Sequence, residues 1–286
     1  MSNALIGILT LLISGWALSV RPTLPAQSGG QTLPSNVERA RAILTEGLDS
    51  KDFKVRIQAI AAAGMVGHNE ILVKRLDGFL HDKNVEVRLA VVHTLADLRS
   101  AQSEELLREA LEDDSTPEVS FAAAKVLAGW KDSAGTSYLR EIYDGKRKSQ
   151  SGLLHREERN FVGEFHSVPS ALMFIVGKGI GYAPIPGAGE GFSAVALLVK
   201  DPGLSDRAHV LLILGRTKSA ESSDLLRRAL QDHDWSVRAV AAQMIAQTAQ
   251  AELGEALLPL FEDKNRKVRF QAAGAYLHLL PATKQQ

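Results

Sequence analysis

The sequence has no cysteine, few aromatic residues and no excess of charge of either sign. Without cysteine, the chain of 286 residues cannot build a disulfide framework, a thiol nucleophile, a zinc knuckle or an iron–sulfur site. Its 33 Lys and Arg residues balance 33 Asp and Glu residues, whereas a general nucleic-acid binder normally carries a basic excess. Because 45% of the residues are hydrophobic and 23% are charged, as in an average globular protein, bulk disorder is not expected.

The N-terminus carries an uncharged, mostly apolar run at residues 4–20, followed by Arg21 and Pro22. This length is typical of an export signal and short for a membrane span, although no Lys or Arg precedes the run. We therefore expect residues 1–26 to be a cleaved signal peptide or an uncleaved anchor that associates with a membrane through residues 4–20. A buried first helix is the remaining alternative. Either main reading makes the protein exported: periplasmic, secreted or membrane-anchored. Residues 27–36, which are polar and include Gly29, Gly30 and Pro34, are predicted to be a linker.

A pattern of about 31 residues recurs through the rest of the chain. Each unit has a turn with Asp, an Arg six residues later, and then an Ala-rich apolar stretch. The Arg position recurs at 56, 88, 120, 207, 238 and 269, with Ser at 120. The one long interval, between 120 and 207, predicts a degenerate unit and an atypical loop at 145–168, followed by a Gly/Pro-rich turn at 177–191.

A shorter amphipathic segment precedes the Ala-rich stretches, as at residues 70–80, 103–111, 222–230 and 252–261. In the third of these, Leu225, Leu226, Ala229 and Leu230 share one helical face. The unit is therefore a helical hairpin, and one hairpin cannot bury its apolar stripe alone. We predict an all-α fold, an α-solenoid of about seven stacked hairpins over residues 37–286.

This pattern resembles the HEAT-like repeat family, in particular the short-repeat branch that includes the phycobilin lyase subunits. The resemblance implies a structural ladder of turn aspartates and helix arginines along the stack. An Asp before a helix also suits capping of free backbone N–H groups, and the planar Arg fork can bridge neighbouring turns. Ser50 and Ser120 depart from the pattern. The ladder residues are Asp82, Arg88, Asp201, Arg207, Asp232, Arg238, Asp263 and Arg269.

No catalytic or metal-binding constellation stands out. HEAT-like deoxyhypusine hydroxylases hold iron through His-Glu pairs, but this chain has eight His and no His-Glu dipeptide. His81 and His233 are expected at the surface of turns. The glycines at 177–191 do not form a phosphate-binding loop, because Lys178 is followed by Gly179 rather than by Ser or Thr. We expect no catalytic residue, metal or cofactor, and the chain is predicted not to be an enzyme.

The favoured function is a non-catalytic protein–protein interaction scaffold of the cell envelope, with a protein partner and no nucleic acid. The alternative is an enzyme or enzyme subunit of the HEAT-like lyase or hydroxylase kind. Recognition is expected at the exposed starts of the Ala-rich helices and at the atypical loop, since loops on rigid scaffolds often carry function. The candidate partner-binding residues of the loop are Lys146, Arg147, Lys148, Arg156 and Arg159.

Overall fold

The computed structural model describes residues 35–67, 69–146, 201 and 203–281, which all belong to one compact unit, Pro34–Gln286. All regular structure in these residues is helical, and the predicted all-α fold of stacked helical hairpins is confirmed. Most of the predicted N-terminal segment and linker, the atypical loop beyond Lys146 and the Gly/Pro-rich turn lie outside the described residues. The first helix begins at Asn36, inside the end of the predicted linker.

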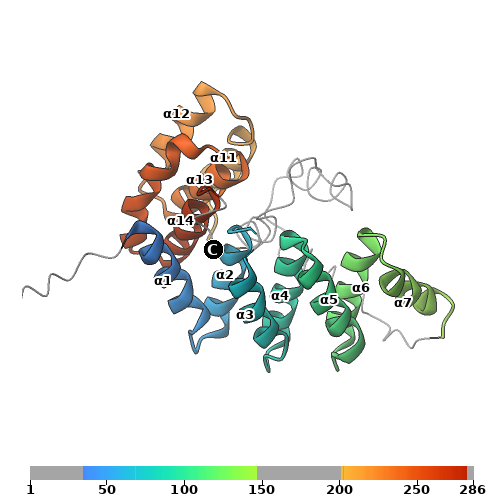
Figure 1. Ribbon diagram of the computed structural model, residues 1–286. Coiled ribbons are helices and arrows are strands. Elements are labelled where there is room, and N and C mark those ends of the chain that lie inside the picture. Colours follow the sequence, from blue (N-terminus) through green and yellow to red (C-terminus); the bar gives the residue numbers. More distant parts are fainter. Residues whose placement is uncertain (1–34, 68, 147–200, 202, 282–286) are drawn as a thin grey trace, which may run out of the picture. The chain divides into compact units, whose positions relative to one another are not determined.

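The helices form hairpins in which a first, amphipathic helix precedes a second, Ala-rich one (Figure 1). For two of the hairpins the structure describes one helix only, α7 in one hairpin and α11 in the other. The first helices are α1 (Asn36–Leu48), α3 (Glu70–Leu80), α5 (Ala101–Asp113), α7 (Ser133–Tyr143), α12 (Ala220–Ala229) and η1 (Ala251–Glu262). The second helices are α2 (Phe53–Gly64), α4 (Val85–Leu98), α6 (Pro117–Gly129), α11 (Asp206–Leu214), α13 (Trp235–Gln247) and α14 (Arg266–His278).

Side-chain caps fix where the second helices begin. Asp52, Asn84, Asp234 and Asn265 each accept a hydrogen bond from the backbone N–H two residues further on, at 2.8–2.9 Å. Such caps satisfy donors that the first helical turn leaves without a partner. Helix α6 lacks a side-chain cap bond and starts instead with Pro117, which needs no N–H partner at that position.

One first helix differs from the amphipathic α-helix predicted for residues 252–261. Residues Ala251–Glu262 form a 3₁₀ helix, η1, with Pro259 inside it. Proline has no amide hydrogen for the bond to the carbonyl four residues earlier, so it disfavours a regular α-helix there. The apolar face survives this change, because Leu253, Leu257 and Leu260 remain buried.

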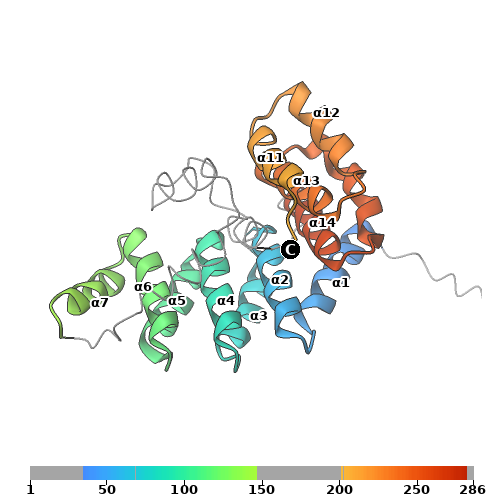
Figure 2. The ribbon, with the colours of Figure 1, turned by 180° about the vertical axis from the view of Figure 1, so that it is seen from behind.

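The order of the hairpins in space is not their order in the chain. The second helices pack side by side in the order α11, α13, α14, α2, α4, α6. The last hairpin, η1–α14, therefore stacks on the first, α1–α2, as both ribbon views show (Figures 1 and 2). The outermost helices of the described stack are α7 and α11, and in the chain they flank residues 147–200. We call the contact of η1 and α14 with α1 and α2 the terminal joint. The repeat spacing predicts stacked hairpins, but it does not predict this contact between the two ends of the repeat array.

Two glycines allow the close approach at the terminal joint. A Cβ atom added to Gly274 on α14 would lie 2.4 Å from the carbonyl oxygen of Ala62 and 2.7 Å from Cε of Met65. A Cβ atom added to Gly47 on α1 would lie 2.6 Å from Cζ of Phe270. Real Cβ atoms do not approach other heavy atoms this closely, so the joint depends on the absence of side chains at both positions.

A salt bridge and an aromatic contact lie at the rim of the same joint. Arg39 Nη2 on α1 is 2.8 Å from Glu262 Oε1 at the end of η1, and the Arg39 guanidinium lies 5.7 Å from the ring centroid of Phe261.

Among the described helices, none has the length and apolarity needed to cross a bilayer.

Candidate functional site

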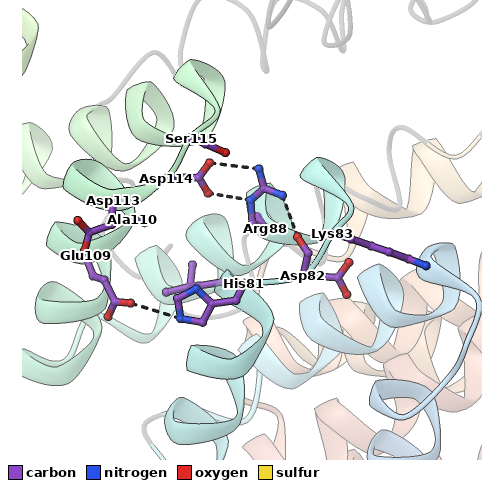
Figure 3. A pocket seen from close by; sticks show the side chains of 10 residues that line it. His81, Asp82, Lys83, Arg88, Glu109, Ala110, Asp113, Asp114 and Ser115 are labelled. Atoms are coloured by element: carbon purple, nitrogen blue, oxygen red, sulfur yellow. Dashed lines mark hydrogen bonds and ion pairs between the residues drawn. The ribbon is translucent and has the colours of Figure 1, made fainter.

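The turns between hairpin helices are joined by buried arginine–aspartate pairs. Arg88 on α4 is nearly buried, and its Nε and Nη2 atoms lie 2.7 and 3.1 Å from the two carboxylate oxygens of Asp114 in the next turn (Figure 3). Its Nη1 atom donates to the backbone carbonyl of Asp82, at 2.8 Å. One guanidinium thus connects two successive turns through its planar fork.

The same arrangement recurs along the stack. Arg238 bonds both carboxylate oxygens of Asp263 at 2.6 and 2.9 Å, and its Nη1 atom donates to the carbonyl of Asp232 at 2.7 Å. Arg207 also bonds the Asp232 carboxylate, at 2.9 and 2.5 Å, but its side chain is 58% exposed, so this pair is not buried like the others. Arg56, which was not among the predicted ladder residues, bonds the Asp82 carboxylate at 2.8 Å. In each case the carboxylate comes from the turn of the next hairpin.

Asp201 differs from the other ladder aspartates. Its carboxylate forms a salt bridge with Lys267 of α14, and its Oδ1 atom accepts from the backbone N–H of Gly203 at 3.0 Å. The Lys267 ammonium also lies 4.7 Å from the ring centroid of Trp235. Arg207, predicted to share a ladder position with Asp201, has its carboxylate partner in Asp232 instead.

The sequence suggested that the turn aspartates cap the helices that follow. In the structure they do not cap these helices directly. Asp82, Asp232 and Asp263 each accept a hydrogen bond from the backbone N–H two residues later, at 2.8–3.0 Å. That later residue is the N-cap of the following helix. An aspartate carboxylate readily accepts a hydrogen bond from the backbone N–H two residues later. Each turn aspartate therefore shapes the turn before the helix, and the residue that it bonds serves as the cap.

Hydrogen bonds keep two of the ladder carboxylates, those of Asp232 and Asp263, charged. The hydrogen bond from Arg207 lowers the pKa of Asp232 below its ordinary value and outweighs the opposing effect of burial. Burial alone would raise the pKa of Asp263, but the hydrogen bonds from Arg238 and from the backbone of Asn265 bring it below the ordinary value. These groups are therefore ionised at neutral pH, and they hold adjacent turns together.

The terminal joint lacks such a pair. Arg269 of α14 donates to the carbonyl of its own turn residue, Asp263, at 2.8 Å, and forms no ion pair with another described residue. The position that would supply the carboxylate, in the turn of the first hairpin, is Ser50. The last hairpin therefore meets the first through small residues and apolar packing rather than through a buried ion pair.

A basic hollow lies over the terminal joint. Its volume is about 370 Å³. Lys264 and Arg266 are exposed there and form no ion pair with another described residue, whereas Lys267 is held by Asp201. The hollow is lined by Asp52, Lys54, Val55, Gln58, Lys264, Asn265, Arg266 and Lys267. Four cationic side chains from α2, α14 and the turn before it thus gather around one carboxylate, that of Asp52.

A second hollow, of about 320 Å³, lies between the turn after α3 and the turn after α5 (Figure 3). His81, at the end of α3, points its Nε2 atom toward Glu109 Oε1 of α5, at 3.4 Å. The Asp77 carboxylate, one helical turn before His81, lies close to both, and the three ligand-type atoms are all within 4.8 Å of one another. We call these three side chains the Asp77–His81–Glu109 cluster.

Sequence reasoning missed this cluster. It placed His81 at the surface of a turn, which is right, but it found no converging ligands around it. The spacing of four between Asp77 and His81 does place both on one helical face. Glu109 is far from them in sequence, and only the packing of α5 on α3 brings it close.

Of the predicted partner-binding residues, only Lys146 lies in the part of the chain that the structure describes. Lys146 is exposed, and its Nζ atom lies 3.2 Å from the carboxylate of Asp144. Arg147, Lys148, Arg156 and Arg159 lie outside the described residues.

Comparisons with known proteins agree with this repeat architecture. A family model of HEAT repeats matches residues 70–150 and 193–277, more than half of the chain. No curated relative matches the chain. Among solved structures, human deoxyhypusine hydroxylase in complex with glycerol is similar to 85% of this chain over 96% of its own, with 15% identity and a TM-score of 0.30.

The prediction that the chain is not an enzyme is corrected. The finding that overturns it is the similar solved structure, which is that of a hydroxylase. The prediction rested on the lack of a catalytic or metal-binding constellation recognisable in the sequence, the missing His-Glu pairs among them. At a TM-score of 0.30 the likeness carries no argument for hydroxylase activity in this chain. The assignment to the phycobilin lyase branch stays a prediction.

Proposed function

Because the chain belongs to the HEAT-repeat family, we propose that it is a scaffold that binds a protein partner along the exposed starts of its second helices. Stacked helical hairpins present long, rigid surfaces of this kind. Fold alone does not give a function, so the proposal depends on the side chains at that surface.

The observation that carries the proposal is the charge order along the stack. The first turns of α14, α2, α4 and α6, which are neighbours in that order, carry Lys267, Lys54, Glu86 and Glu118 respectively. The surface is therefore basic beside the terminal joint and acidic further along. In chain order the two lysines are more than 200 residues apart, and only the terminal joint brings them together.

This order favours a partner with an acidic segment. The basic hollow supplies Lys54, Lys264 and Arg266 as donors for carboxylates, and charge-assisted hydrogen bonds to such groups are stronger than neutral ones. Opposite charges further along the surface would set the direction in which the partner lies.

The location of the scaffold is part of the proposal. We propose that the protein is exported and works in the cell envelope, either free of residues 1–26 or anchored by them, on the basis of the apolar run at 4–20. Cell fractionation with N-terminal sequencing of the purified protein tests this. A cytoplasmic chain that retains an intact N-terminus would contradict it.

Proximity labelling of the full chain in its native cells, compared with charge-reversed variants, tests the binding proposal. The test variant is Lys54→Glu with Lys264→Glu. The matched control is Lys74→Glu with Lys131→Glu, which reverses two exposed lysines away from the basic hollow. A partner with an acidic segment should be lost from the test variant and kept by the control. A partner kept equally by both, or no reproducible partner for the unchanged protein, would contradict the proposal.

The enzyme alternative, a HEAT-like lyase or hydroxylase, has its own test. Bound iron or a chromophore in the protein purified from its own cells, together with turnover, would favour it over the scaffold.

A further inference from the structure

The Asp77–His81–Glu109 cluster joins two neighbouring hairpins. Asp77 and His81 come from the last turn and the end of α3, and Glu109 comes from the middle of α5, which packs beside α3. Asp77 and Glu109 are half-buried, while the His81 side chain is 68% exposed. An ion at this place would be reached directly from solvent and would connect two repeats.

The charges of the cluster are not compensated by neighbouring cations. Within the described residues, Asp77 has no hydrogen bond or ion pair, and Glu109 has His81 as its partner. Arg88 faces Asp114, and Lys83 extends away from the cluster (Figure 3). Two carboxylates therefore converge on one imidazole, and a cation bound among the three groups would relieve the repulsion between the carboxylates.

The separations suit a small cation. Ligand atoms about 2.1 Å from a tetrahedral metal ion are about 3.4 Å apart. His81 Nε2 and Glu109 Oε1 already have that separation, 3.4 Å, and the widest separation within the cluster is at most 4.8 Å. Asp77 and Glu109 are not fully buried, so their side chains can rotate toward a bound ion.

We propose that Asp77, His81 and Glu109 bind a divalent transition-metal ion, for which Zn²⁺ is the test ion. An imidazole nitrogen with two carboxylates suits Zn²⁺ and its neighbours, whereas Ca²⁺ and Mg²⁺ prefer all-oxygen sites. Three protein ligands leave a position for water or for a group from another molecule. The bound ion clamps α3 to α5 next to the Arg88–Asp114 pair.

Isothermal titration of the full chain, free of any affinity tag, tests the proposal. Zn²⁺, Mn²⁺ and Ca²⁺ are titrated separately, and thermal unfolding is followed by circular dichroism with and without each ion. The variants are His81→Ala, Asp77→Asn and Glu109→Gln, which change groups that are exposed or half-buried and so should fold. The matched control is His233→Ala, because His233 is also exposed and lies 3.3 Å from one carboxylate, that of Asp232, but forms no ion pair with a second carboxylate among the described residues.

The proposal predicts one Zn²⁺ per chain and a higher Tm with Zn²⁺, since an ion that binds only the folded state stabilises it. Each of the three ligand variants should weaken Zn²⁺ binding by more than about tenfold and abolish the Tm shift, while His233→Ala leaves both unchanged. Two results would overturn it. One is the absence of Zn²⁺ and Mn²⁺ binding at millimolar ion, and the other is binding that His81→Ala leaves intact.

Discussion

Two kinds of joint hold the same stack of hairpins together. Between α4 and α6, and between α13 and α14, a buried arginine fork connects one turn to the carboxylate of the next. Between α14 and α2, where the last hairpin meets the first, Gly274 and Gly47 let backbones and side chains approach closely instead. Equivalent packing of HEAT repeats can therefore rest on charge or on shape, and the two kinds of joint should respond differently to mutation and to acid.

The largest expected effect comes from breaking a charged joint. Asp114→Ala leaves the Arg88 guanidinium buried without its carboxylate, which should lower the free energy of unfolding by about 3–4 kcal/mol. Urea denaturation followed by circular dichroism measures this. Asp144→Ala, which removes only an exposed partner of Lys146, is the control and should have no measurable effect. A loss of less than about 1 kcal/mol for Asp114→Ala would show that the arginine forks contribute little.

The next effect comes from breaking the joint that depends on shape. Gly274→Ala places a methyl group against the carbonyl of Ala62, which cannot rotate away, and should cost about 1–3 kcal/mol. Gly78→Ala on α3 is the matched control, because nothing lies within 4 Å of its added Cβ. At that exposed helical position alanine should stabilise the protein by about 0.5–1 kcal/mol. Replacement of Gly by Ala should thus lower the free energy of unfolding at position 274 and raise it at position 78. Equal changes at the two positions would contradict the close approach at the terminal joint.

Acid should weaken the charged joints before the terminal joint, so the two kinds can be distinguished without mutation. The pKa values of Asp232 and Asp263 are lowered in the folded state, so their contribution to stability is complete above the ordinary aspartate pKa of 3.8 and is lost as the pH falls through their folded values. Below pH 3.8 the ladder should weaken. Amide hydrogen exchange should then rise in the turns before α13 and α14 sooner than in the interface between α1 and α14. If the turns and the α1–α14 interface lose protection at the same pH, the two kinds of joint do not differ in their sensitivity to acid.

Adding a carboxylate to the terminal joint should change stability the least of these substitutions. Ser50→Asp offers Arg269 the partner that the other ladder arginines have, and should raise the free energy of unfolding by about 0.5–1 kcal/mol. Ser50→Asn, which adds similar volume without charge, should give less. A decrease in stability for Ser50→Asp alone would show that Arg269 cannot reach this turn.

Much of the fold could be predicted from the sequence because each repeat carries its own local signals. The helix predicted at 70–80 has those bounds in the structure, since Asn69 caps it and its apolar face is periodic. The resemblance to HEAT-like repeats pointed to most of the aspartates and arginines of the ladder, but not to Arg56 or Asp114. It could not show which residues they pair with, because the partner of each arginine lies in the next turn in space.

The remaining features depend on contacts that no local signal encodes. The terminal joint brings together Gly47 and Phe270, which are more than 200 residues apart in the chain. Glu109 joins Asp77 and His81 only because α5 packs on α3. Pro259 was visible in the sequence, yet the amphipathic pattern around it indicated an α-helix, where the structure has a 3₁₀ helix.

The most direct test of the terminal joint uses the lack of native cysteine. Arg39→Cys with Glu262→Cys introduces a single pair of thiols on α1 and η1, at side chains that are 2.8 Å apart in the unchanged protein. A short bismaleimide cross-linker should join them within one chain at high dilution, giving a cyclised product by electrophoresis and mass spectrometry. The control pair, Tyr143→Cys with Glu262→Cys, lies on α7 and η1, which do not pack together among the described contacts, and should not be joined. If the first pair stays unlinked in a folded, helical protein, the last hairpin does not stack on the first, and the account of the terminal joint is wrong.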